Sequence, residues 1–258
     1  MTTAFPMLFA RCVIALLGVV SLLWLSACEA KPREMPFSQP ITLDAPYSSR
    51  DVIWAVVPLT NESGTSLPDE LAITDALVNT IREVDGLSAL PTNRVINAMR
   101  AMQMPGVYSP SDARKLAQTL GADAILVGSI TAWNPYHPPQ LGMTVALFAR
   151  TDKMRMSELS RLDPLVLRQA MTDAGISVDE FRDMPVALVA GHYDAANHAV
   201  LSDVRRYATG RHDPRTSLGW EYYTKSMARY TEFVCFRVVA DLLQQEGQRV
   251  APAEANIR

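Results

Sequence analysis

Residues 120–130 have the sequence LGADAILVGSI, and this stretch decides the fold of the chain. From Ala124 to Ile130 it is mostly apolar, which is typical of a strand that is buried on both faces. Gly121 stands just before this run, where glycine commonly ends a helix. Upstream, the segment 109–112 (SPSD) offers a capping serine and an early proline, so it predicts the start of a helix. The stretch therefore predicts a helix, its stop and a central strand.

The same pattern continues on both sides of this stretch. The run VIWAVVPL from Val52 to Leu59 predicts a second buried strand. Shorter strands are predicted around 87–90, 143–148 and 186–189. Helices are predicted from Ser66 to Gly86, from Thr92 to Met102, over 164–174, from Asp194 to Gly210 and from Leu218 to Gln245. This order predicts an α/β (α+β) fold, a mixed sheet covered by helices with a long C-terminal helix.

The N-terminus predicts export from the cytoplasm. In residues 1–28 the only charge is Arg11, and the stretch from Cys12 to Leu25 is apolar except for Ser21. A helix of that length spans about 21 Å, which is short of the ~30 Å hydrocarbon core of a membrane. The length and the charge fit a secretory signal peptide over 1–27 better than a membrane-spanning helix.

This segment ends in Leu25-Ser26-Ala27-Cys28, which resembles the bacterial lipobox. The resemblance implies cleavage between Ala27 and Cys28 and attachment of lipid, palmitate included, to Cys28. Glu29 after the cysteine favours the outer membrane over the inner one. We therefore expect a lipoprotein that faces the periplasm; the alternative is an ordinary signal peptide with a chance cysteine at its end.

Composition divides the rest of the chain. Residues 28–50 contain dispersed prolines among polar residues and predict an extended tether after the lipidated cysteine. Residues 51–245 are expected to form the α/β domain, within which 151–217 is less regular and insertion-like, and 246–258 forms a C-terminal tail. Cys235 would be the remaining thiol after processing, and its apolar neighbours predict a buried side chain.

The stretch 120–130 and residues 56–64 (VVPLTNESG) together resemble the TolB amino-terminal domain. Similar domains occur in CsgG-type curli secretion lipoproteins and in LpoB-type lipoprotein activators of penicillin-binding proteins. The resemblance covers about residues 50–150. It implies a non-catalytic module that binds envelope proteins or assembles into a homo-oligomer. Its CsgG branch implies an alternative, an oligomeric secretion-pore subunit, which requires long alternating strands within 151–217.

No catalytic or cofactor motif stands out. The formal charge of −3 and the pI near 5.8 give no reason to expect a nucleic-acid partner. We expect no cofactor, because the glycines are dispersed and no phosphate-binding loop is present. A third hypothesis is a metal-dependent hydrolase that uses His192, Asp194 and His198, with His212 or His137 nearby. Asp194 fits a helix cap equally well, so we expect no metal site.

Two loops are candidate contact surfaces. Trp133, Asn134, Tyr136 and His137 belong to a proline-rich loop, and such stiff loops with aromatic side chains suit protein partners. The alternative is a hairpin loop braced by its prolines. The turn formed by Pro58, Asn61 and Gly64 follows a central strand, where α/β folds often bind ligands, although turn chemistry alone explains these residues. The partner itself is not identified by the sequence.

Overall fold

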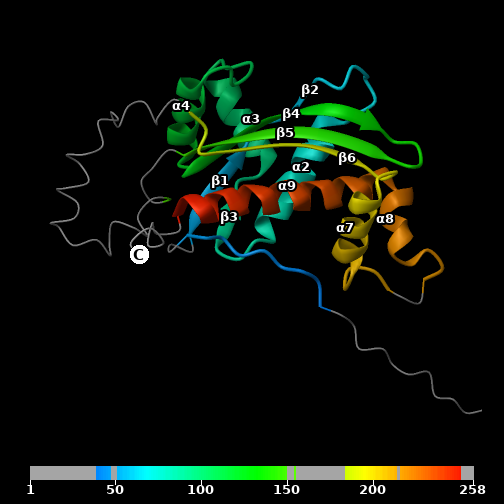
Figure 1. Ribbon diagram of the computed structural model, residues 1–258. Coiled ribbons are helices and arrows are strands. Elements are labelled where there is room, and N and C mark those ends of the chain that lie inside the picture. Colours follow the sequence, from blue (N-terminus) through cyan, green and yellow to red (C-terminus); the bar gives the residue numbers. More distant parts are fainter. Residues whose placement is uncertain (1–38, 48–50, 150–153, 155–183, 214–215, 251–258) are drawn as a thin grey trace, which may run out of the picture. The chain divides into compact units, whose positions relative to one another are not determined.

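The computed structural model describes residues 39–47, 51–149, 154, 184–213 and 216–250. Within these ranges the chain forms a six-stranded mixed sheet with helices on both faces (Figure 1). The strands are β1 (Val52–Val56), β2 (Thr60–Asn61), β3 (Leu87–Ala89), β4 (Ala124–Asn134), β5 (Gln140–Ala149) and β6 (Ala187–Asp194). The helices are α2 (Glu70–Arg82), α3 (Thr92–Ala101), α4 (Pro110–Leu120), α7 (His198–Ala208), α8 (Tyr222–Lys225) and α9 (Met227–Val250). The predicted fold class is confirmed.

The main path of the sheet has the strand order β3-β1-β4-β5-β6, and β2 pairs with the far end of β4. β1 is parallel to both of its neighbours, whereas β4, β5 and β6 are antiparallel. The stretch 120–130 behaves as predicted. The side chain of Ser109 caps α4, Gly121 ends that helix with a φ of 68°, and β4 follows. The strand predicted at 143–148 is confirmed as part of β5, antiparallel to β4.

Several helix boundaries differ from the predicted ones. Asp69, not Ser66, caps α2, and its Oδ1 accepts a hydrogen bond from the amide of Ala72 at 3.0 Å. The reason is Pro68, which keeps the preceding residue out of helical backbone and delays the start of the helix. Thr92 is the first residue of α3 and not its cap, and its hydroxyl donates to the carboxylate of Asp75 instead.

The C-terminal half shows two further differences. Asn197, not Asp194, caps α7, because Oδ1 of Asp194 accepts from the amide of Ala196 at 2.7 Å and closes the turn before the helix. The helix predicted from Leu218 is broken at Ser226, whose extended backbone (φ −114°, ψ 116°) separates α8 from α9. The helix predicted over 164–174 lies outside the described residues.

Each face of the sheet carries its own core. On one face α2 and α9 pack against β1, β4 and β5 around Trp54, Leu126 and Phe233. On the other face α3 and α4 pack against β1 and β4 around Val57, Val95 and Leu116. Figure 1 shows α3 and α4 on the opposite side of the strands from α9. This second layer covers only part of the sheet, and the site described below lies at its border.

Residues 39–47, which the sequence predicts as tether, contact the body. The backbones of Leu43 and Ala45 pair with Asp85 in the turn after α2, and the carbonyl of Ile41 accepts a bond from Arg211 at 2.8 Å. Tyr47 is buried, 8% exposed, against Trp54. Residues 41–47 therefore form a strap over the domain. Among the helices of the described residues, none combines the length and the apolarity that a membrane span requires.

Candidate functional site

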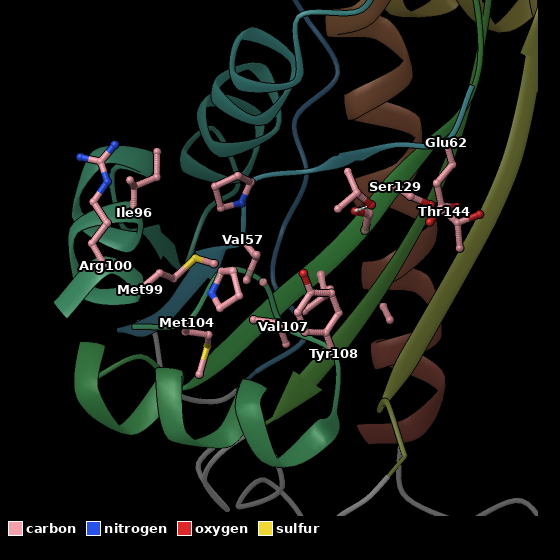
Figure 2. Close-up of a pocket in the computed structure, with 17 residues that line it drawn as sticks. Val57, Glu62, Ile96, Met99, Arg100, Met104, Val107, Tyr108, Ser129 and Thr144 are labelled. Atoms are coloured by element: carbon pink, nitrogen blue, oxygen red, sulfur yellow. Dashed lines mark hydrogen bonds between the residues drawn. The ribbon is translucent and has the colours of Figure 1, made fainter. Parts of the chain in front are cut away.

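A pocket of about 600 Å³ opens where the second helical layer ends. Its walls come from α3, from the loop between α3 and α4, and from β4 and β5 (Figure 2). The volume lies within the range of about 300–1,000 Å³ that is common for ligand sites. Direct partners in the antiparallel pair β4–β5 share a face, so Val127 and Ala146, and Ser129 and Thr144, form the sheet side of this pocket.

The helix and loop side of the pocket is apolar. Met99 projects from α3, and Met104 and Val107 come from the loop that follows it (Figure 2). Methionine has a flexible, polarisable side chain, so it adapts to apolar partners of different shapes. This wall therefore suits an apolar group more than a charged one.

Tyr108 stands between the two walls and is 80% exposed. Its ring lies over Gly106, where an added Cβ would come within 2.7 Å of the ring. The amide of Tyr108 donates to Oδ2 of Asp112 at 3.3 Å, and a hydrogen bond with Ser109 holds the pKa of that carboxyl below its ordinary value. The loop thus holds a large exposed aromatic residue at the mouth of the pocket.

Gly128 lies on β4 between the pocket residues Val127 and Ser129. A Cβ at this position would lie 2.5 Å from the backbone oxygen of Thr144 and 3.0 Å from the side chain of Leu59. Leu59 belongs to the core on the α2/α9 face, so glycine at 128 permits close packing on the face of β4 opposite the pocket. Gly128 and Ser129 lie inside β4, as the sequence predicts, and not in a catalytic turn.

The polar groups of the pocket are few and separate. Glu62 and Arg100 lie at opposite ends of the view in Figure 2, and Ser129 and Thr144 lie side by side on the sheet. Within the described residues that line the pocket there is neither histidine nor cysteine. This composition suits binding of an apolar group with a small number of orienting polar contacts.

Of the three turn residues that the sequence singles out, Pro58 lines this pocket, as do Thr60 and Glu62 from the same segment, whereas Asn61 and Gly64 do not. The side-chain oxygen of Asn61 accepts from the amide of Ser63 at 3.0 Å, its amide donates to the carbonyl of Thr65 at 2.7 Å, and Gly64 has a φ of 75°. These are the bonds of a tight turn, so the turn-chemistry alternative is confirmed for Asn61 and Gly64.

The candidate partner-binding loop joins β4 to β5 away from the pocket. Tyr136 is 73% exposed, whereas Trp133 is partly buried and packs against the core on the α2/α9 face. The side chain of Asn134 accepts from the amide of Tyr136, and Nδ1 of His137 lies 3.3 Å from the carbonyl oxygen of Thr224. Of the four residues, Tyr136 and His137 are thus exposed, and Trp133 and Asn134 are partly buried. Their role in binding a partner stays a prediction.

The remaining sequence candidates are dispersed. His192 lies on β6, His198 begins α7, and Asp194 between them accepts from Gln140 at 3.1 Å. In the part of the chain that the structure describes, no cluster of three potential metal ligands was found. Cys235 is fully buried as predicted, and burial raises the pKa of its thiol to about 12. Ala27 and Cys28 lie outside the described residues.

Sequence reasoning missed this pocket. The helix predicted from Thr92 to Met102 includes Met99, which is 8% exposed, but the loop that completes the wall carries no motif. The usable signal is the closely spaced methionines 99, 102 and 104 before an exposed tyrosine. Such a pattern favours an adaptable apolar surface.

No protein-family model matches the sequence, and no curated protein matches it. Among solved structures, a PelC dodecamer from Paraburkholderia phytofirmans is 20% identical, with a TM-score of 0.28 over 42% of this chain and 66% of that one. The C-terminal domain of LpoB from Salmonella enterica is 19% identical, with a TM-score of 0.30 over 42% of this chain and 74% of that one. Lipoprotein GNA1162 from Neisseria meningitidis is 18% identical, with a TM-score of 0.30 over 47% and 93%. Likenesses this partial assign no function.

Proposed function

We propose that this chain is a lipid-anchored, non-catalytic binding module of the bacterial cell envelope. Its lipid is attached to Cys28, after cleavage at Ala27, and its domain faces the periplasm from the outer membrane. The domain binds an apolar segment of an envelope protein in the pocket between α3 and the sheet.

The single observation that carries the binding role is the pocket itself. Its apolar walls, its exposed tyrosine and its few separated polar groups provide binding surface without the paired acid, base or nucleophile that catalysis requires. Exposed aromatic and methionine side chains are enriched where proteins contact one another. The lipobox resemblance at 25–28 supports the anchoring role.

The strap limits how far the domain reaches from its lipid. Its contact nearest to the N-terminus is the hydrogen bond that Arg211 donates to the carbonyl of Ile41. Between Cys28 and Ile41 a fully extended chain spans at most about 45 Å, at about 3.5 Å per residue. A partner in the pocket is therefore an envelope component that lies close to the anchoring membrane.

The test is quantitative co-purification from solubilised membranes. Ala146 lies on the pocket floor, so Ala146→Arg fills the pocket with a long cation. Gln118→Arg adds the same charge on the exposed surface of α4 and is the matched control. We expect one envelope protein to co-purify with the wild type and with the control. Its recovery should fall about tenfold with Ala146→Arg. Equal recovery with all three, for chains that melt at the same temperature, would overturn binding at this pocket.

A further inference from the structure

A second concave surface lies on the other face of the sheet. It is a groove of about 740 Å³ between α2 and the first turns of α9. Tyr207, which belongs to the core on that face, and Trp133, which packs against this core, form part of its floor. The proposed function uses the pocket on the α3/α4 side and leaves this groove without a role.

The α2 wall of the groove is small and apolar at its centre. Ala72 and Ala76 are one helical turn apart and therefore lie next to each other on the same helix face. Small side chains let a second helix approach closely, since the distance between helix axes depends on the residues at the contact. Leu67 stands at the beginning of this wall and is 60% exposed, which offers an apolar contact at the end of the groove.

Negative charge flanks this apolar strip. Three carboxylates on the α2 side, Asp69, Asp75 and Glu83, and one on α9, Glu232, line the groove. Among the described residues of the lining, Arg229 is the only base, and its guanidinium already bonds both oxygens of Glu232, at 2.9 and 3.1 Å. The groove therefore presents an apolar floor beside an α2 wall that carries three carboxylates, while on the α9 wall Arg229 balances Glu232.

We propose that this groove binds a basic amphipathic helix of a partner protein. The apolar face of that helix would lie on Ala72, Ala76 and Trp133, and its lysine or arginine side chains would reach the carboxylates on the rims. This is helix-in-groove recognition with charge complementarity setting its specificity. Because the groove and the pocket occupy opposite faces of the sheet, the domain can hold two ligands at once and act as an adaptor.

The test uses two synthetic peptides of about 18 residues, a length of about 27 Å as a helix. Both have the same leucine face; one carries lysine on its polar face and the other glutamate. The protein is the Cys28→Ser chain, which keeps every described residue. We expect the lysine peptide alone to bind, measured by fluorescence anisotropy, and to bind about tenfold more weakly when salt rises from about 50 to about 300 mM.

Variants locate the binding. Ala76→Arg places a long cation in the strip, and we expect it to raise the Kd of the lysine peptide at least about tenfold. Gln118→Arg adds the same charge on the other face and should leave the Kd unchanged. Glu83→Gln removes one negative charge from the edge of the groove without adding bulk, and it should raise the Kd of the lysine peptide less than Ala76→Arg does. Circular dichroism melting checks that each variant folds.

Four outcomes would overturn the proposal: no binding of either peptide, equal binding of both, equal Kd values for Ala76→Arg and Gln118→Arg, or a dimer that Ala76→Arg abolishes. The last outcome, seen by analytical ultracentrifugation, would assign the groove to a second copy of this chain. The outcome of the Ala146→Arg test on the pocket does not affect the peptide-binding result, because Ala146 lies on the opposite face of the sheet.

Discussion

The phenol of Tyr47 donates a 2.8 Å hydrogen bond to Oε2 of Glu246, a fully buried carboxylate 199 positions further along the chain. Arg249 completes the charge balance, with bonds of 2.8 and 2.6 Å to the two oxygens of Glu246. This contact joins the strap to the end of α9. The strap, residues 41–47, is thereby fixed to the last helix of the domain.

We predict that Tyr47→Phe destabilises the domain by about 2 kcal/mol. The substitution keeps the ring against Trp54 but removes one donor from a buried carboxylate, and hydrogen bonds to charged groups are worth about 1.5–3 kcal/mol. Urea unfolding measures the change. Tyr136→Phe, at a side chain 73% exposed, is the matched control and should change stability by less than about 0.5 kcal/mol. Equal stabilities of the two variants would show that the strap bond contributes nothing.

Alkaline pH should also destabilise the domain. Burial raises the pKa of Tyr193 from 10.0 to about 12, and it raises that of Tyr47 as well. The raised pKa values mean that the folded chain retains protons that the unfolded chain loses, so this stability is complete below about pH 10 and falls as pH rises towards 12. Tyr193→Phe should make the fall between pH 10 and 12 shallower, as measured by urea unfolding at each pH. If the fall in stability between pH 10 and 12 had the same slope in Tyr193→Phe, Tyr193 would not be a source of this pH dependence.

Two glycines should respond in opposite directions to alanine. Gly128→Ala forces a Cβ to within 2.5 Å of a backbone oxygen in β5, so the strands must shift; we expect a loss of about 2 kcal/mol or more. Gly247 lies inside α9. The atom nearest to an added Cβ would be the Cβ of Pro46 at 3.8 Å, which is an ordinary contact distance. Gly247→Ala should therefore stabilise by up to about 1 kcal/mol. Thermal unfolding of both variants checks this pair, and a loss of stability from Gly247→Ala would contradict the 3.8 Å spacing between strap and helix.

Cys28→Ser should release the protein from membranes. Acyl chains contribute about 0.8 kcal/mol for each buried CH₂, so losing them removes the anchor. Fractionation after ultracentrifugation, followed by immunoblotting, measures the release. Ser26→Thr, which changes the motif without removing the cysteine, controls for impaired export. Continued sedimentation of Cys28→Ser with membranes would refute lipid anchoring.

The sequence predicts the layers of this fold better than their ends. The helical spacing of apolar residues identifies the helices, and the apolar runs at 52–59 and 124–130 identify the central strands, because these positions are buried. Helix caps are less predictable, since neighbouring polar residues compete for the same role. Asp69 replaces Ser66, and Asn197 replaces Asp194, through local bonds that only the folded backbone decides.

The two concave surfaces are harder to predict for a different reason. The pocket joins Met99 and Tyr108 to Thr144, and the groove joins Ala76 to Trp133 and Met227, all of them distant in sequence. The sequence does identify Trp133 as a candidate contact residue, but it places that residue in an exposed loop. In the structure it is the last but one residue of β4 and packs on the core.

The most direct test of the central claim is crosslinking inside living cells. A photoreactive phenylalanine replaces Tyr108 at the mouth of the pocket, and in a parallel strain it replaces Gln118 on α4. The account predicts that illumination joins the Tyr108 position to one envelope protein, that the Gln118 position yields none of this adduct, and that adding Ala146→Arg abolishes it. The same adduct from both positions, or an adduct that survives Ala146→Arg, would contradict binding in the pocket.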